Sequence, residues 1–506
     1  MNRILKNTAT VGAFTALSRV LGLAREMLQS RFIGAGVEQS AFTLAFALPN
    51  MARKLFGEGA LTAAFVPVFK GEVEANAMES ARRLARAVMT MALLMLGAIV
   101  ALAVLGLETA VHFRVGLEMT GRTLLTVRLV KTLLPYMIFI CGAAFGMGVL
   151  NAMGRFKASS AMPCLLNVVW IGMLVWICFH PELRLDQRIH RVAMAILVAG
   201  AVQMAFMMGC MHRAGVTPGI AFSGWGDAKV RLVWKNTAIA AVGAGAVQIN
   251  YMLDQVLGQI AAPWAAGVIG YAERLMDLPL GVIGVAFGTV LLPTFSGFFA
   301  KGDVEGAREA FVSSSRQMLF VMVPAAVGLG VLAPEVTSVI YRGGAFDAIA
   351  VTRVSRAVAV YAVGLGFFGL QKSLVPWFQA QNDMKTPLRT SVWTVCLNAV
   401  LNILAVACLP VEWRHVGLAA STTLCAVCGC VLLVRAARRR NGTLGIVRLV
   451  APVAKMLAGS AAMAAAILAL KAFTELPHIL ALALYMAAGG AVYFAVMAAM
   501  GVKKKG

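Results

Sequence analysis

Charged residues are scarce in this chain. Only 13% of its 506 residues are Asp, Glu, Lys or Arg, while 60% are hydrophobic. A soluble domain carries about 25% charged residues, so this composition excludes an ordinary soluble protein and predicts a polytopic membrane protein. Acidic residues are rarer than basic residues, 22 against 45, which gives a formal net charge of +23. Because basic residues also set membrane topology, this charge does not require a nucleic-acid partner.

Catalytic and metal-binding signatures are also missing. The six histidines fall near predicted loops or span ends, and the chain has no H-E-x-x-H, P-loop, G-x-S-x-G or aspartate-rich diphosphate motif. Of the nine cysteines, the closest group is Cys425, Cys428 and Cys430, without a histidine or second cysteine pair nearby. We expect buried thiols there, not a metal site or disulfide. The sequence thus favours a transporter without a metal or organic cofactor over an enzyme.

Fourteen apolar segments are long enough to cross a membrane, which takes about 20 residues. The predicted spans are 9–33, 41–69, 87–108, 129–152, 160–180, 192–212, 236–260, 264–298, 317–340, 357–381, 388–410, 415–434, 449–472 and 478–501. The first span carries arginines and lacks a clear small-residue cleavage site, so we expect no cleaved signal peptide. More than twice as many Lys and Arg residues fall on the side of the two termini as on the other side. This bias predicts that both termini are cytoplasmic.

Weak internal similarity indicates a duplication. K-N-T-A at 6–9 recurs at 235–238, and V-P-V-F at 66–69 resembles L-P-T-F at 292–295. These and other matches share an offset near 229, which predicts two six-helix lobes in parallel repeat. The predicted domains are an N-terminal lobe (1–213), a C-terminal lobe (214–440) and two additional C-terminal helices (441–506).

Two arginines, Arg19 and Arg25, lie inside the first predicted span. A guanidinium at membrane depth costs about 2.5 to over 10 kcal/mol, so an anion or water must face it. At the repeat offset their counterparts are Gln248 and Asp254, so the basic side chains are not required to fold a lobe. Arginine pairs bidentately with phosphate oxygens. The pattern therefore predicts a site for a phosphate or diphosphate attached to a lipid-compatible carrier.

Polar residues in the first, second and eighth spans extend this candidate site: Glu26, Asn50, Arg53, Glu58 and Arg274. Glu26 is placed to act as a counter-ion for the arginines. The alternative is that each arginine extends to a membrane interface or neutralises a nearby carboxylate. Because the local carboxylates do not exhaust the positive charge, we favour a ligand cavity.

A second hypothesis concerns ion coupling. Asp254 lies in the seventh span, and Gln379 precedes Asp383 by one helical turn at the end of the tenth span. Together they could bind Na⁺ or H⁺. The alternative is that Asp383 caps the next helix, with Pro387 just inside it.

Several longer strings resemble one known family. They include S-R-V-L-G-L-A-R-E at 18–26, the segment from Phe46 to Phe69 with L-P-N-M-A-R-K-L-F-G-E-G-A, and E-R-L-M-D-L-P-L-G-V-I-G at 273–284. These strings are similar to the MurJ (MviN) family of lipid II flippases, in the multidrug/oligosaccharidyl-lipid/polysaccharide exporter superfamily. The resemblance covers nearly the whole chain. It implies fourteen transmembrane helices, with the last two forming a groove for the polyprenyl tail.

The resemblance also implies a substrate site and an activity. The matching positions for head-group binding are Ser18, Arg19, Arg25, Arg53 and Arg274. The implied activity is movement of undecaprenyl-diphosphate-linked peptidoglycan precursor (lipid II) from the inner to the outer leaflet by alternating access. One departure is Ser40, where the family often has an acidic residue.

Partners and setting follow from the same resemblance. The expected partners are lipid II and membrane lipid, with no nucleic acid, for a monomer that associates with cell-wall synthesis machinery in the bacterial cytoplasmic (inner) membrane. Na⁺, H⁺ and the membrane potential are the candidates for coupling. The alternatives are a flippase for another polyprenyl-linked glycan, a multidrug exporter of the superfamily, or a membrane glycosyl- or phosphotransferase. A drug exporter would favour an acidic cavity, whereas this candidate site is basic.

Overall fold

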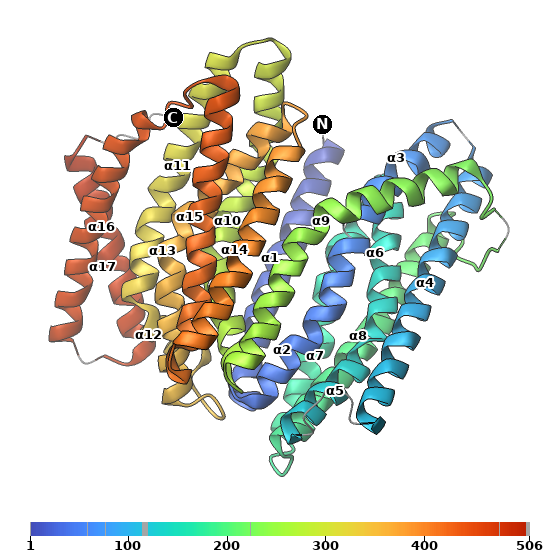
Figure 1. The fold of residues 1–506 in the computed structure, drawn as a ribbon, viewed down its shortest axis with the longest axis horizontal. Coiled ribbons are helices and arrows are strands. Elements are labelled where there is room, and N and C mark those ends of the chain that lie inside the picture. The colour runs from blue at the N-terminus through green and yellow to red at the C-terminus, as the bar shows by residue number, and fades with distance from the viewer. Residues whose placement is uncertain are drawn as a thin grey trace. The chain divides into compact units, whose positions relative to one another are not determined.

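A computed structural model of the chain describes residues 2–57, 59–75, 77–113, 120–222, 224–474 and 476–501. Within these ranges the regular elements are all helices, and the one β-bridge pairs Gly343 with Phe346. This confirms the predicted all-α fold class of a polytopic membrane protein (Figure 1). The elements are α1 (Asn2–Ile33), α2 (Val37–Ala52), a π-helix η1 (Arg53–Gly57), α3 (Ala60–Glu74), α4 (Met78–Phe113), α5 (Gly121–Leu133), α6 (Tyr136–Ala152), α7 (Phe156–Cys178), α8 (Leu185–Arg213), α9 (Ala228–Ala261), α10 (Ala265–Ala300), α11 (Val304–Val331), α12 (Ala333–Tyr341), α13 (Ala348–Gln379), α14 (Lys385–Cys408), α15 (Val411–Asn441), α16 (Val447–Phe473) and α17 (His478–Ala499).

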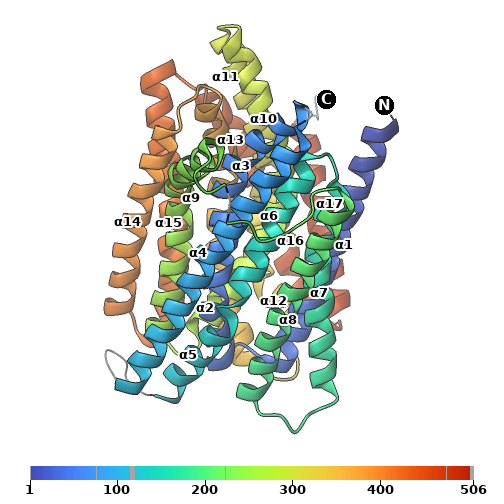
Figure 2. The same ribbon diagram turned by 90° about the vertical axis from the view of Figure 1, so that its right-hand side faces the viewer.

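The chain forms two compact units. Unit 1 comprises Met1–Gln259 together with Gly343–Phe346, and unit 2 comprises Ile260–Arg342 and Asp347–Gly506. In unit 1, α6 packs against both α4 and α8 (Figure 2). In unit 2, α13 packs against α10, α11 and α15, and α16 packs against α11 and α17. The lobes and C-terminal pair expected from the repeat, 1–213, 214–440 and 441–506, stay a prediction.

Each predicted span overlaps one helix or a run of consecutive helices. Among the described residues, ten helical segments are long and apolar enough to cross a membrane, and they match ten of the predicted spans. The other four correspond to α1, the α2–α3 segment, α9 and α10. The second of these is interrupted at η1, which begins four residues after Pro49 of α2, a residue without a backbone N–H. At Gly59, which follows η1, a Cβ would collide with the carbonyl oxygen of Lys54, so this break requires glycine.

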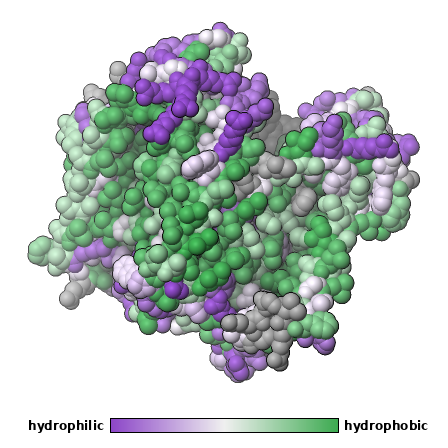
Figure 3. All heavy atoms as spheres, viewed as in Figure 1, coloured by the Kyte–Doolittle hydropathy of each residue, from purple (hydrophilic) through white to green (hydrophobic). Residues whose placement is uncertain are grey.

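Each unit has its own apolar core. In unit 1, the rings of Phe42 and Phe46 both lie 5.6 Å from Trp170 in edge-on contacts. In unit 2, Trp377 lies edge-on to Phe295 at 5.5 Å and to Phe299 at 5.0 Å. On the face shown in Figure 3, hydrophobic residues cover the middles of the helices and hydrophilic residues gather near helix ends. This distribution is the one expected for helices surrounded by lipid.

The C-terminal end of α1 is held by two segments distant in sequence. Arg188, at the start of α8, donates to the carbonyl oxygen of Phe32 at 3.3 Å. The backbone N–H of Ala345 donates to the carbonyl oxygen of Arg31 at 2.8 Å. Ala345 belongs to the Gly343–Phe346 turn, whose Gly344 has a φ of 57°. Carbonyls at a helix C-terminus lack partners within the helix, so these contacts satisfy groups that would otherwise need water.

Candidate functional site

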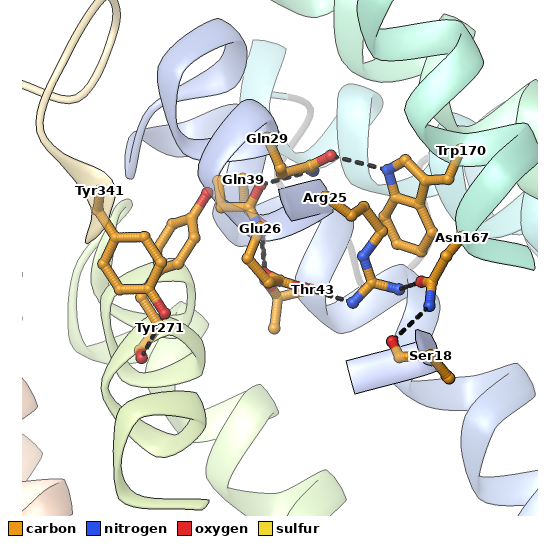
Figure 4. Close-up of polar contacts among 10 residues, drawn as sticks. All are labelled: Ser18, Arg25, Glu26, Gln29, Gln39, Thr43, Asn167, Trp170, Tyr271 and Tyr341. Atoms are coloured by element: carbon orange, nitrogen blue, oxygen red, sulfur yellow. Dashed lines mark hydrogen bonds and ion pairs between the residues drawn. The ribbon is translucent and has the colours of Figure 1, made fainter. Parts of the chain in front are cut away.

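Arg25 is held at the interface between α1 and α7. Its Nη1 donates to Asn167 Oδ1 at 3.1 Å, and its Nη2 forms an ion pair with Glu26. Its guanidinium carbon lies 4.3 Å from the centroid of the Trp170 ring, a cation–π contact. The side chains of Arg25 and Glu26 are only 15% and 10% exposed. The predicted counter-ion role of Glu26 thus has a direct contact in the structure (Figure 4).

The Asn167 amide joins this arginine to the α1 backbone at Ser18, about two helical turns earlier. Its Nδ2 donates to the carbonyl oxygen of Ser18 at 3.1 Å. A Cβ added at Gly22 would lie 3.8 Å from the same nitrogen, so glycine leaves room for the α7 side chain. Ser18 therefore contributes its backbone carbonyl to the site as described.

A chain of hydrogen bonds continues from Trp170 into α2 (Figure 4). Trp170 Nε1 donates to Gln29 Oε1 at 2.9 Å, and Gln29 Nε2 donates to Gln39 Oε1 at 3.0 Å. Gln39 Nε2 then donates to Thr43 Oγ1 at 3.4 Å, and Thr43 Oγ1 donates to the Gln39 carbonyl at 2.8 Å. These polar groups are buried, and their mutual bonds offset the cost of removing them from water. α1, α2 and α7 are thereby connected around Arg25.

The other predicted residues of unit 1 lie on the same two helical segments. Arg19 is exposed on α1, whereas Arg25 is partly buried. Arg53, the first residue of η1, donates from Nε to Asn50 Oδ1 at 3.3 Å. Glu58 lies outside the described residues. Ser40, where the family often has an acidic residue, is fully buried in α2.

Arg274 lies on α10 in unit 2, where it is half-buried. Tyr271, three residues before it on α10, and Tyr341, the last residue of α12, are both buried. Tyr341 donates to the carbonyl oxygen of Tyr271 at 3.4 Å (Figure 4). Within unit 2, Arg274 therefore follows by three residues on α10 a buried tyrosine, Tyr271, that is hydrogen-bonded to Tyr341.

The three residues of the ion-coupling hypothesis lie in different surroundings. Asp254 is buried on α9 and accepts from Asn250 Nδ2 at 3.4 Å. Asp383 accepts from the backbone N–H of Lys385 at 3.1 Å and of Thr386 at 3.0 Å, and it pairs with Arg440 at 2.7 Å. These contacts are those of a helix-capping carboxylate at the start of α14. Gln379 is the last residue of α13. Ion coupling through this set stays a prediction.

Four residues of this network were not predicted from the sequence as site residues: Asn167, Trp170, Gln29 and Gln39. Asn167 and Trp170 are three positions apart on α7, so they share a helix face, and each is a polar or amphipathic residue in an apolar span. That spacing was the only feature of the sequence that indicated a polar face on this span. The partner helix could not be inferred from it, because Arg25 and Asn167 are 142 positions apart.

A family model described as "Lipid II flippase MurJ" matches residues 29–486. A probable lipid II flippase MurJ of Rhizobium tropici is 34% identical over 404 residues, which are 79% of this chain and 75% of that protein. The lipid II flippase MurJ of Burkholderia cenocepacia is 32% identical over 445 residues, covering 85% and 83%. The family-model match begins after Arg25, so it carries no information on Arg19 and Arg25.

Solved structures show the same fold. A lipid II flippase MurJ in an inward closed conformation aligns with a TM-score of 0.79 at 21% identity, covering 97% of this chain and 98% of that one. An inward-facing multidrug resistance transporter of the MATE family aligns with a TM-score of 0.67 at 13% identity, covering 84% and 95%. At these identities the likeness is one of architecture alone.

Proposed function

Since the chain belongs to the lipid II flippase MurJ family, we propose that it moves lipid II from the inner to the outer leaflet of the bacterial cytoplasmic membrane for peptidoglycan synthesis. The family match over residues 29–486 is the observation that carries this proposal. It is supported by a positively charged first helix of the kind that a diphosphate head group requires. The protein is accordingly a multi-pass membrane transporter.

Arg25 is the residue for which the structure offers the most direct mechanism. Without substrate, Glu26 neutralises its guanidinium, so the protein does not leave a buried charge unpaired. A diphosphate carries more charge and more acceptor oxygens than one carboxylate. We infer that the diphosphate displaces Glu26 and takes its place on the guanidinium, with Asn167 and Trp170 unchanged.

Arg19, Arg53 and Arg274, with Ser18, Asn50 and Glu58, complete the proposed substrate site. In this proposal the two six-helix lobes move alternately to expose the site to each leaflet, while the polyprenyl tail stays in lipid against the last two helices. Both termini face the cytoplasm. Outward movement of a dianion is favoured by an inside-negative potential, by about 2.3 kcal/mol per charge per 100 mV. Na⁺ or H⁺ bound through Asp254, Gln379 and Asp383 is the candidate for resetting the cycle.

Two other functions are less well supported. A multidrug exporter of the superfamily would favour acidic groups for cationic drugs, whereas α1 contributes Arg19 and Arg25 with only Glu26 beside them. A flippase for another polyprenyl-linked glycan would use the same diphosphate chemistry, and the family match argues against it. The proposed transporter performs no catalysis, acts as a monomer and associates with cell-wall synthesis machinery.

Depletion of the protein tests the function. Lipid II is expected to accumulate in the inner leaflet, as measured by its accessibility to an externally added lipid II hydrolase or probe. Wild-type protein should restore exposure, and Arg435→Ala, an exposed residue near the end of α15, should do the same. Outer-leaflet lipid II that persists during depletion, in a strain without a second flippase, would contradict the proposal.

Single alanine variants test the site. Arg25→Ala should abolish complementation, and Arg25→Lys should restore it only in part, because an ammonium lacks the planar fork. Arg19→Ala, Arg53→Ala and Arg274→Ala should each impair lipid II exposure. Normal exposure in all four alanine variants would show that the site lies elsewhere.

A further inference from the structure

Asn167 and Trp170 of α7 both contact the guanidinium of Arg25 on α1. We propose that they are positioning residues for Arg25: they fix its guanidinium so that one defined edge is presented to the diphosphate of the substrate. This inference rests on the proposed function and adds two residues that do not themselves contact the substrate. It concerns unit 1 alone.

The two edges of the Arg25 guanidinium have different environments. Nη1 is bound by Asn167, whereas Nη2 is bound by Glu26. Nε is buried and has no hydrogen-bond partner among the described residues. Nε and Nη2 together form the side-on fork of an arginine, the arrangement that matches two oxygens of a phosphate. When Glu26 leaves, this fork becomes available, while Nη1 stays on Asn167.

Asn167 can hold Nη1 because its own orientation is fixed. Its Nδ2 donates to the Ser18 carbonyl, so its Oδ1 must be the atom that faces Arg25. An amide turned by 180° would place an NH₂ group against the cation and an oxygen against a carbonyl. Asn167 is only 5% exposed, so water does not compete for either bond.

Trp170 fixes the plane of the guanidinium. Its ring lies against Arg25 and is itself enclosed by Phe42 and Phe46, and the residue is 1% exposed. Its Nε1–H is donated to Gln29, which prevents rotation of the indole. Arginine otherwise loses much side-chain freedom on binding a ligand. Fixing it beforehand reduces that cost and improves affinity.

The test compares the affinity of purified full-length protein in nanodiscs for undecaprenyl diphosphate and for undecaprenyl monophosphate. The two ligands share a tail, so their ratio reports the head-group site. Asn167→Ala should lower diphosphate affinity about tenfold, the effect of losing one hydrogen bond to a charged group. Monophosphate affinity should change less. Trp170→Leu should act similarly, and Trp170→Phe, which keeps a ring, should lie between it and wild type.

Two controls separate positioning from a general structural effect. Trp176→Phe removes an indole from the same helix, where Trp176 is partly exposed and stacks on His180. It should leave both affinities unchanged. Asn167→Ala combined with Arg25→Ala should bind the diphosphate no more weakly than Arg25→Ala alone, because Asn167 acts through Arg25.

Failure of the positioning role and failure of the proposed function give different results in this test. Asn167 is not a positioning residue if Asn167→Ala and Arg25→Ala reduce diphosphate affinity additively. The same conclusion follows if Asn167→Ala leaves the ratio of diphosphate to monophosphate affinity unchanged. Should Asn167→Ala fail to fold, Trp170→Phe provides the test. An unchanged ratio of diphosphate to monophosphate affinity in Trp170→Phe overturns the inference, and a reduced ratio supports it. Wild-type protein that binds neither lipid would instead contradict the proposed function.

Discussion

The turn at Gly343–Phe346 allows a quantitative prediction about stability. Gly344 has a φ of 57°, a conformation that costs an L-residue about 1–2 kcal/mol. A Cβ at this position would also collide with the carbonyl oxygen of Arg31. Gly344→Ala must therefore move the turn and weaken the bond from Ala345 N–H to Arg31, worth about 1 kcal/mol. We expect a total loss of about 2–3 kcal/mol.

Gly154 provides a matched control. Its φ is 71°, yet a Cβ there would meet nothing within 4 Å. Gly154→Ala should therefore lose only the conformational part, about 1–2 kcal/mol.

Thermal unfolding in detergent, followed by tryptophan fluorescence, should place Gly344→Ala below Gly154→Ala, and both below wild type. Hydrogen exchange measured by mass spectrometry should show faster exchange at 343–346 in Gly344→Ala only. Equal melting temperatures and unchanged exchange in the two variants would refute the role assigned to this contact.

Three further predictions concern other parts of the fold. Arg188→Ala should lower the melting temperature, because Arg188 donates to the carbonyls of Phe32, Pro181 and Leu183, whereas Arg184→Ala, at an 81% exposed side chain, should not. Trp377→Ala should destabilise unit 2 by about 3–5 kcal/mol, because it leaves a cavity where the Trp377 ring packs against Phe295 and Phe299. A loss of less than about 1 kcal/mol would mean that the neighbouring side chains move in to fill this cavity. Burial raises the pKa of Asp383, but hydrogen bonds from Thr386 and the charge of Arg440 outweigh burial and hold the pKa below its ordinary value. The stability that Asp383 contributes is therefore present above the unfolded pKa of about 3.9 and is lost as the pH falls through the lower folded pKa. Asp383→Asn should consequently show a smaller fall in melting temperature on acidification than wild type.

Hydropathy was sufficient to locate the ten spans that match apolar helices of the described residues, because an apolar run long enough to cross a bilayer is a local property of the sequence. It could not show that the second span breaks into α2, η1 and α3, although Pro49 and Gly59 lie at that break. Nor could it predict that the Gly343–Phe346 turn would join unit 1. Such a contact depends on how distant helices pack.

The candidate site was predictable to a similar degree. Arg25 stood out because a permanent charge in an apolar segment has a high energetic cost, and Glu26 was adjacent in the sequence. Asn167 and Trp170 carry no charge, so the same criterion could not find them. Their roles follow only from the packing of α1 on α7, which brings residues 142 positions apart within hydrogen-bond distance.

The hydrogen-bond chain from Trp170 to Thr43 has a consequence for sequence divergence. Indole can only donate, so it sets the direction of each amide after it: Gln29 accepts with Oε1 and donates with Nε2, and Gln39 does the same. Replacing Trp170 by a residue that only accepts would require both amides to reverse and Thr43 to become the donor to Gln39. A substitution at any one of these positions therefore changes the selective constraint on the others, and we expect Gln29, Gln39 and Trp170 to be retained or exchanged together among relatives.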